Sequence, residues 1–273
     1  MKFPKKYKGA LCIYFDYELQ KGNDSSKEKN KALWKGQDDY YQTKIILDLL
    51  KKYNVKATFA ILGHCAKKGK LPYHAPEQIK LIAKKGHEIA SHSQNHEHLP
   101  DLSYNEVVRT LTESKYLLEE LTKKKVQTFV PPYNSPVELY SQSLNIKTLR
   151  KSKLSIGKLC HALAETGYKT IRLTKISPLR HKVFNSANSY EPKFIGNVMA
   201  LTLNASAGFS KQAKKAVDHA IKQNKVAVVY GHPHSLAIDN EQNATFFENF
   251  LQYIKGKKEL WITTPSEIYK RIK

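Results

Sequence analysis

Residues 86–96, with the sequence GHEIASHSQNH, lead from a short strand-like run into two histidines that are four positions apart. If residues 92–96 form one helical turn, the imidazoles of His92 and His96 lie on the same face, about 5–6 Å apart at Cβ. That spacing suits two nitrogen ligands on one zinc-like ion. The same spacing also arises by chance on solvated helices, so the interpretation depends on the rest of the chain.

Outward from this stretch, apolar runs alternate with segments of helical periodicity. Residues 10–15 are apolar throughout, which is typical of a strand buried on both faces of a parallel sheet. Further strands are predicted at residues 57–62, 88–90, 128–130, 170–173, 226–230 and 260–262. Helices are predicted at residues 75–85, 103–125, 141–151, 156–166, 211–223, 246–254 and 265–272. Another is predicted to follow Asp38 or Asp39, either of which can cap it. This alternation implies parallel β/α units.

Two segments do not follow this pattern. Residues 20–37 are rich in Lys, Asn, Ser and Asp and predict a long loop, which in a compact domain is usually functional or mobile. Residues 175–210 give no assignment. The length of 273 residues and the hydrophobic fraction of 41% allow a sizeable core, and single α/β barrels reach this size.

The chain is strongly basic. It has 46 Lys and Arg against 24 Asp and Glu, a formal net charge of +22. This balance favours polyanions or an anionic membrane surface as partners. Because the lysines are spread over the whole chain, generic lysine use by the genome is the alternative explanation. No nucleic-acid-binding signature is evident, so no nucleic acid is expected as a partner.

Location is inferred from what the sequence lacks. The three cysteines are far apart and form no C-x-x-C pair, which argues against a disulfide framework or a thiolate zinc site. No apolar run approaches the 18–20 residues of a membrane-spanning helix, and the run after the basic N-terminus is too short for a signal peptide. We expect a cytoplasmic protein, with peripheral attachment to the inner membrane face as an open alternative.

Polar residues suited to chemistry all follow predicted strands. They are Asp16 and Glu18, His92, Tyr133 and His232. In parallel α/β folds, ligands and catalytic groups collect at the carboxyl ends of the strands. The sequence therefore predicts one active site at that edge.

The types of these residues suggest metal chemistry. Asp16 and Glu18 are two positions apart, so in an extended segment they point to the same side, where one can bind a cation while the other acts as a base. His92, His96 and one carboxylate make a two-His-one-carboxylate set with open positions for water. Such an ion lowers the pKa of a bound water. Later in the chain, His232 could protonate a leaving amine, and His234 is either a further ligand or a group behind the ligands.

These motifs resemble those of the polysaccharide deacetylases of the NodB-homology type, carbohydrate esterase family four. The first family motif, a strand that ends in Phe-Asp-Asp, is matched by residues 14–18 (YFDYE), and the second, His-Ser/Thr-x-x-His, by residues 92–96 (HSQNH). The third, Arg-x-Pro-Tyr, is matched in part by residues 130–133 (VPPY), and the late Leu-x-His motif by residues 230–232 (YGH). The motifs follow the family order from residue 10 to residue 234.

The resemblance implies an α/β fold, an irregular (β/α)7 barrel of parallel strands, in one catalytic domain over residues 1–273. It also implies a metal-dependent hydrolase of carbon–nitrogen bonds other than peptide bonds. The divalent metal, most commonly Zn²⁺, would be held by Glu18, His92 and His96. The substrate would be an acetylated amino sugar in a glycan or glycolipid precursor.

Carried over by position, Asp16 is the general base, His232 is the general acid, and the backbone amide of Tyr133 helps to bind the oxyanion. The chain departs from the family at two positions. Tyr17 replaces the aspartate that normally binds the metal, which gives that role to Glu18. Val130 replaces the arginine that normally orients the base, so another cation, Arg172 or a lysine, would have to act instead.

These departures leave other functions open. The substrate could be phosphate-bearing or lipid-linked. A second enzymatic alternative is a deformylase, or a hydrolase of a small cyclic amide, on the same fold. A third, from another class, is a barrel that binds a glycan or polyanion without turnover.

Overall fold

The fold is built around strand β1 (Gly9–Tyr17), which is buried along its whole length. It pairs in parallel with β2 (Thr58–Ile61), β11 (Val226–Gly231) and β12 (Leu260–Thr263). The coordinates are a computed structural model, which describes residues 3–26, 35–139, 142–145, 150–151, 153–174 and 190–273. Because both faces of β1 are covered, the strand reads as a continuous apolar run.

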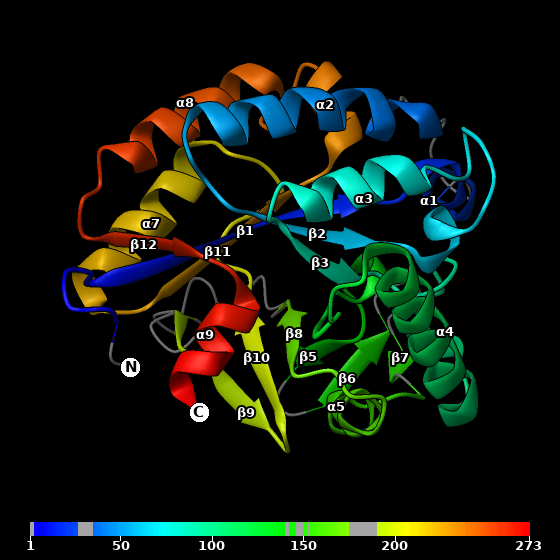
Figure 1. The fold of residues 1–273 in the computed structure, drawn as a ribbon. Coiled ribbons are helices and arrows are strands. Elements are labelled where there is room, and N and C mark those ends of the chain that lie inside the picture. The colour runs from blue at the N-terminus through cyan, green and yellow to red at the C-terminus, as the bar shows by residue number, and fades with distance from the viewer. Residues whose placement is uncertain (1–2, 27–34, 140–141, 146–149, 152, 175–189) are drawn as a thin grey trace.

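The main sheet has the strand order β11-β1-β2-β3-β4-β8-β10-β9, with β12 beside β1 (Figure 1). Its remaining strands are β3 (Glu88–Ser91), β4 (Thr128–Phe129), β8 (Thr170–Leu173), β9 (Lys193–Ile195) and β10 (Val198–Thr202). The seven strands from β11 to β10 pair in parallel, and the edge strand β9 is antiparallel to β10. The sheet is therefore mixed rather than purely parallel.

The sheet curls so that its two ends approach each other. The chain after β10 meets β11, where the backbone amides of Asn204 and Gly208 donate to the carbonyls of Val228 (3.0 Å) and Tyr230 (2.9 Å). The expected irregular barrel is confirmed as this curled sheet.

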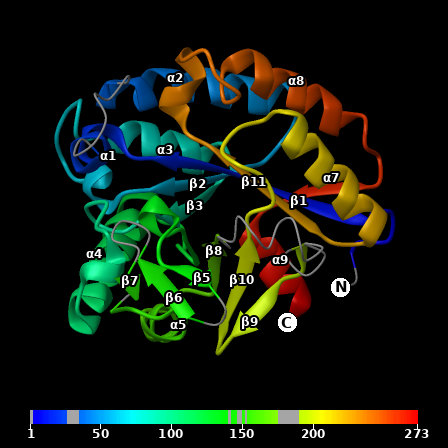
Figure 2. The same cartoon turned by 180° about the vertical axis from the view of Figure 1, so that it is seen from behind.

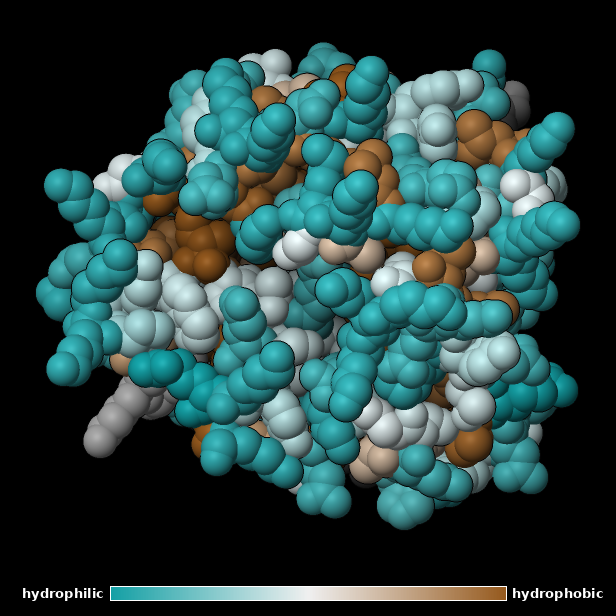
Figure 3. Space-filling view, in the orientation of Figure 1, coloured by the Kyte–Doolittle hydropathy of each residue, from teal (hydrophilic) through white to brown (hydrophobic). Residues whose placement is uncertain are grey.

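Helices cover the outside of the sheet (Figures 1 and 2). They are α1 (Leu19–Ser26), α2 (Gly36–Lys52), α3 (Pro76–Lys84), α4 (Tyr104–Thr122), α5 (Ile156–Glu165), α7 (Lys211–Gln223) and α8 (Ala244–Lys255). The last helix, α9 (Pro265–Ile272), packs instead below the barrel, where Ile268 and Tyr269 join its interior. Figure 3 shows a mostly hydrophilic face with smaller apolar patches. Among the described helices, none has the length and apolar character needed to cross a bilayer.

Alternation along β1 sets up the site. Leu11, Ile13 and Phe15 belong to the large core beneath the helices. Residues of the other parity, Ala10, Cys12 and Tyr14, belong to the smaller core inside the barrel. Successive side chains of a strand point to opposite faces, so Asp16 and Glu18 lie on the same inward-facing side as Tyr14. They stand at the mouth of the barrel.

Several predicted elements are confirmed, including α7 and α9 at their predicted bounds. Helix α4 begins with the expected capping box, in which Ser103 accepts from the Glu106 amide and the Glu106 carboxylate accepts from the Ser103 amide. Strands β9 and β10 lie in the segment that gave no assignment, of which residues 175–189 fall outside the described residues.

Two predicted elements are wrong. The helix predicted at residues 141–151 is absent from the described part of that segment, which contributes to a three-stranded antiparallel sheet of β5 (Val137–Leu139), β6 (Gln142–Asn145) and β7 (Arg150–Lys151). Ser and Asn are poor helix formers there, and cross-strand pairing prevails. The described part of the loop predicted at residues 20–37 instead forms most of α1 and the start of α2, while residues 27–34 fall outside the described residues. Helix α1 has no apolar stripe that would have predicted it.

Candidate active site and metal centre

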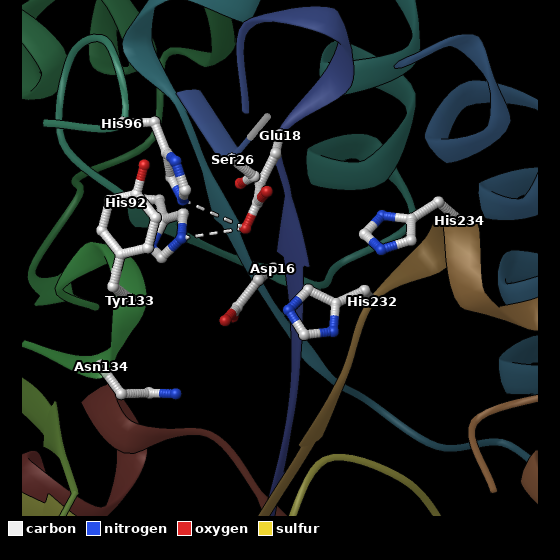
Figure 4. Close-up of a pocket in the computed structure, with 9 residues that line it drawn as sticks. All are labelled: Asp16, Glu18, Ser26, His92, His96, Tyr133, Asn134, His232 and His234. Atoms are coloured by element: carbon white, nitrogen blue, oxygen red, sulfur yellow. Dashed lines mark ion pairs between the residues drawn. The ribbon is translucent and has the colours of Figure 1, made fainter. Parts of the chain in front are cut away.

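The ends of the parallel strands meet around a pocket of about 180 Å³. Its lining comes from the end of β1, from α1 and from the segments after β3, β4 and β11 (Figure 4). The lining residues are Asp16, Glu18, Ser26, His92, His96, Tyr133, Asn134, His232 and His234. The six residues predicted for the site therefore all lie in one pocket.

Glu18, His92 and His96 form a candidate metal centre on one wall. Their ligand atoms lie within 4.8 Å of one another, and all three side chains are buried. Oε1 of Glu18 is 3.4 Å from Nε2 of His92 and 3.4 Å from Nε2 of His96. Ligand atoms about 2.1 Å from one ion at tetrahedral angles stand about 3.4 Å apart, whereas a direct charged hydrogen bond would be about 2.7–2.9 Å. The donor set fits a divalent ion.

Two features prepare these groups as ligands. Nδ1 of His92 donates to the carbonyl of Val130 at 2.8 Å, which fixes the ring and leaves Nε2 facing Glu18. Burial alone would raise the pKa of Glu18, but the imidazoles of His96 and His92 outweigh it and hold that pKa well below its usual range. Glu18 is therefore ionised, as a carboxylate ligand must be.

The expected helical turn at residues 92–96 is wrong. Ser93 and His96 have φ of 69° and 62°, so the segment is a tight loop. Its backbone is held by hydrogen bonds from the amides of Gly63 and His64 to the carbonyls of Ser93 and Gln94. The two imidazoles are nevertheless neighbours, with ring centroids 5.3 Å apart.

Asp16 is held by Arg172 from β8. The guanidinium donates to Oδ1 at 2.7 Å and to Oδ2 at 2.6 Å, and also to Oδ1 of Asn134 at 3.0 Å. Burial would raise the pKa of Asp16, but Arg172 and, to a smaller extent, His92 outweigh it and lower that pKa. Of the two replacements left open for the missing third-motif arginine, the structure shows Arg172, while Val130 is buried in the barrel interior.

The two late histidines have different partners on the opposite wall. The Oε1 atom of Gln242 accepts from the backbone amide of His232 at 2.8 Å and from its Nδ1 at 3.0 Å, which leaves Nε2 toward Asp16 (Figure 4). His234 instead donates from Nδ1 to Asp39 at 3.0 Å. Within the described residues, His234 is not part of the metal-binding group, so it is not a further ligand there.

Backbone strain is concentrated around the pocket. Eight non-glycine residues in the described chain have left-handed φ. Three stand at helix ends, where this conformation is common: Asn54, Lys123 and Asn224. The other five lie in segments that carry pocket residues: Leu19, Ser93, His96, Tyr133 and Asn134. Residues held in such conformations cluster at functional sites.

Tyr133 closes one side of the pocket. Its ring packs on that of His96 with centroids 4.4 Å apart, and its hydroxyl donates to the carbonyl of Ser25 at 3.0 Å. Its φ of 57° is followed by 50° at Asn134. The role predicted for its backbone amide stays a prediction.

Some functional residues were missed from the sequence. Asn134 and Ser26 line the pocket, and Gln242 and Asp39 hold its two late histidines. Asp39 was interpreted only as a helix cap. No local signal marks Gln242, whose place depends on a contact made across the fold.

The fold and this site define a NodB-like barrel protein with a candidate metal centre at its mouth. Residues 26–150 match the family model for polysaccharide deacetylase. The chain is 34% identical over 93 residues to the peptidoglycan-N-acetylglucosamine deacetylase of Bacillus cereus, an alignment that covers 34% of this chain and 32% of that protein. Residues 26–150 are thus similar to the polysaccharide deacetylases, and the fold is the one that this class of protein shares. The chain spans between 18% and 45% of the length of the first curated relatives that it matches.

Solved structures share the fold over nearly the whole chain. A candidate polysaccharide deacetylase from Mycobacterium smegmatis has a TM-score of 0.71 and 18% identity, with coverage of 100% of this chain and 92% of that one. PuuE allantoinase has a TM-score of 0.67 and 15% identity, with coverage of 98% and 91%. Two differently named proteins share this fold, so the fold alone does not identify the substrate.

Proposed function

We propose that this protein is a metal-dependent deacetylase that hydrolyses the N-acetyl group of an amino sugar in a glycan. The observation that carries the proposal is the juxtaposition of the Glu18, His92 and His96 group with the ion-paired Asp16 in one pocket. The family match and the name of the Bacillus cereus relative support the acetylated amino sugar as the substrate class.

In the proposed mechanism, Glu18, His92 and His96 hold the ion, for which we propose Zn²⁺. When bound, the ion supplies Lewis-acid activation of water and of the acyl oxygen. Asp16 accepts the proton of the attacking water, and Arg172 keeps this carboxylate ionised and fixed in direction.

The other side of the pocket serves the leaving group. With Nδ1 of His232 donating to Gln242, its Nε2 carries the proton that passes to the departing amine. The backbone amide of Tyr133 donates to the oxyanion of the tetrahedral intermediate. His232 and Tyr133 line the same pocket as Asp16 and the three candidate metal ligands, which supports their acting on one bound substrate.

The test is acetate release from N-acetylglucosamine oligomers and from peptidoglycan fragments by protein of known metal content. N-formylated oligomers are the comparison substrate. We expect acetate release by the wild type and loss of it in His92→Ala. Formate release alone would support the deformylase alternative. Release of neither acid by the metal-loaded protein, together with glycan binding, would support a barrel without turnover.

The finer proposal for partners and location is a phosphate-bearing or lipid-linked amino sugar, processed in the cytoplasm at the inner membrane face. It is supported only by the net charge of +22. An anionic leaflet attracts lysines at about 1 kcal/mol each near the surface.

A further inference from the structure

Asp39 connects the two walls of the pocket. Its side chain is fully buried, with 0% exposure, and accepts four hydrogen bonds. Oδ2 accepts from the amides of Glu18 (2.9 Å) and Leu19 (2.8 Å). Oδ1 accepts from the amide (2.9 Å) and from Nδ1 (3.0 Å) of His234. One carboxylate therefore joins the end of β1 to the segment that follows β11.

This arrangement is not needed to cap α2. The half-buried neighbour Asp38 does that, since its Oδ2 accepts from the amide of Lys35 at 2.6 Å. A buried carboxylate is costly unless donors satisfy it. All four donors of Asp39 come from residues that lie in the pocket wall or next to it, so the contacts of Asp39 are directed at the site.

On the metal side, Asp39 holds a strained turn. Leu19 has φ of 51°, an unfavourable conformation for a leucine. The two hydrogen bonds to Oδ2 hold the backbone amides on either side of the Cα atom of Glu18. They keep the chain in the turn from which the Glu18 side chain reaches the two imidazoles.

On the opposite wall, Asp39 sets the direction of His234. Both the amide and the ring nitrogen of His234 donate to the same oxygen, so the ring cannot turn without losing a bond. His234 faces the pocket and its ring lies 5.1 Å from that of His232 (Figure 4). Burial lowers the pKa of His234, but Asp39 outweighs it, and the pKa lies above its usual range.

We propose that Asp39 is a positioning residue whose buried carboxylate fixes Glu18 on the metal wall and His234 on the opposite wall at the same time. The part that concerns Glu18 rests on the metal site proposed above.

The experiment compares Asp39→Asn with Asp38→Asn in the full chain. The amide group of Asn keeps the size of Asp but replaces one acceptor oxygen with a donor, so the two bonds to one wall are lost. The two bonds to the other wall are weakened as well, because the acceptor no longer carries a negative charge. Zn²⁺ affinity, measured by calorimetry, should fall about 10-fold or more in Asp39→Asn, as for other groups that orient ligands. In NMR titrations, His234 should lose its proton at lower pH in Asp39→Asn, and the amide resonances of Glu18 and Leu19 should move. Asp38→Asn should match the wild type in zinc affinity and in the two amide resonances. It should change the titration of His234 less than Asp39→Asn does, because Asp38 contributes less to the pKa of His234.

Wild-type zinc affinity and wild-type titration of His234 in Asp39→Asn would overturn the proposal. If the wild-type protein binds no zinc, the proposed metal site is wrong. The positioning role of Asp39 is then tested by the NMR measurements alone. Changes at both Glu18 and His234 that are larger in Asp39→Asn than in Asp38→Asn then support Asp39 as the link. A change at only one of them, or at neither, overturns it.

If Asp39→Asn does not fold, the link is tested from the other wall. His234→Asn keeps an N–H donor close to the position of Nδ1, and His234→Leu removes it. The amide resonances of Glu18 and Leu19 should move in the Leu variant and stay near their wild-type positions in the Asn variant. Equal spectra for the two variants would overturn the proposal.

Discussion

Arg172 donates to both carboxylate oxygens of Asp16, at 2.7 and 2.6 Å, although 156 positions separate the two residues in the chain. The guanidinium also lies over the ring of Tyr230, with 4.5 Å from Cζ to the ring centroid. Arg172 is fully buried and Asp16 is 3% exposed. The pair thus fixes the candidate base inside the barrel, and its loss has consequences for both folding and activity.

Replacing Arg172 with Met should lower the free energy of unfolding by about 3–5 kcal/mol, because Asp16 is left as an uncompensated buried charge. The double variant Asp16→Asn, Arg172→Met should be more stable than the single variant, since that charge is gone. Chemical denaturation at pH 7 measures both. A double variant no more stable than Arg172→Met would show that packing, and not charge, accounts for the loss.

Removing either candidate histidine ligand should weaken Zn²⁺ binding by about 10-fold or more, since losing a ligand costs at least as much as losing a group that orients one. His92→Ala and His96→Ala are measured by metal analysis and calorimetry. Stoichiometric metal in the double variant would exclude this site. If Asp16→Asn abolishes binding while Glu18→Gln does not, the base and the ligand have been exchanged.

Asp16→Asn and His232→Ala should each reduce turnover by about 10²–10⁴-fold, the usual contribution of a positioned proton transfer. Metal content should remain at the wild-type level in both. Near-normal turnover of Asp16→Asn would remove Asp16 from the mechanism. If His234→Ala is inactive and His232→Ala is not, the late motif has been aligned two residues off.

His87 should make the fold sensitive to mild acid. Burial, with smaller contributions from Lys56 and Lys85, lowers its pKa to about 4, and its Nδ1 accepts from the amide of Ala57 at 3.3 Å. The unfolded chain takes up a proton near pH 6.5 and the folded chain does not, so stability is present above that pH and is lost as the pH falls from about 6.5 toward about 4. The loss between pH 7 and pH 5 should be about 2 kcal/mol.

Urea denaturation at several pH values, compared with His87→Asn, isolates this contribution. The Asn oxygen can accept from the Ala57 amide but does not titrate. The variant should lose less stability on acidification than the wild type. Parallel curves for the two proteins would mean that His87 is not the group responsible.

The net charge predicts binding to anionic vesicles. Co-sedimentation should appear with phosphatidylserine-containing vesicles, disappear with purely zwitterionic ones, and weaken as salt screens the charges. Equal recovery in the supernatant under all three conditions would contradict membrane contact.

Much of the fold was predictable because it depends on local patterns. The apolar run at β1, the capping box at Ser103 and the periodicity of α7 were read correctly. The helical turn at residues 92–96 was wrong because left-handed φ at Ser93 and His96 depends on the surrounding loops. The helix at residues 141–151 was wrong because strand pairing outweighs weak local preference.

The candidate site likewise contains some residues that the sequence indicated and others that it did not. Asp16, Glu18, His92 and His232 follow strands and stand in motifs, so the sequence marked them before any contact was known. Arg172 was only one of two open choices, and Asp39 was interpreted as a cap. Their partners lie far away in the chain, at Asp16 and at His234, and nothing near them in sequence indicates those contacts.

The ion pair between Arg172 and Asp16 also affects how relatives of this protein can be found. Its guanidinium comes from β8, while the family's usual place for it, before the Pro-Pro-Tyr turn, holds Val130. A search pattern that demands arginine at that place would discard this chain, and any other in which the charge has moved to a different strand. A query written as distances between side-chain atoms, with no order along the chain, would retain them.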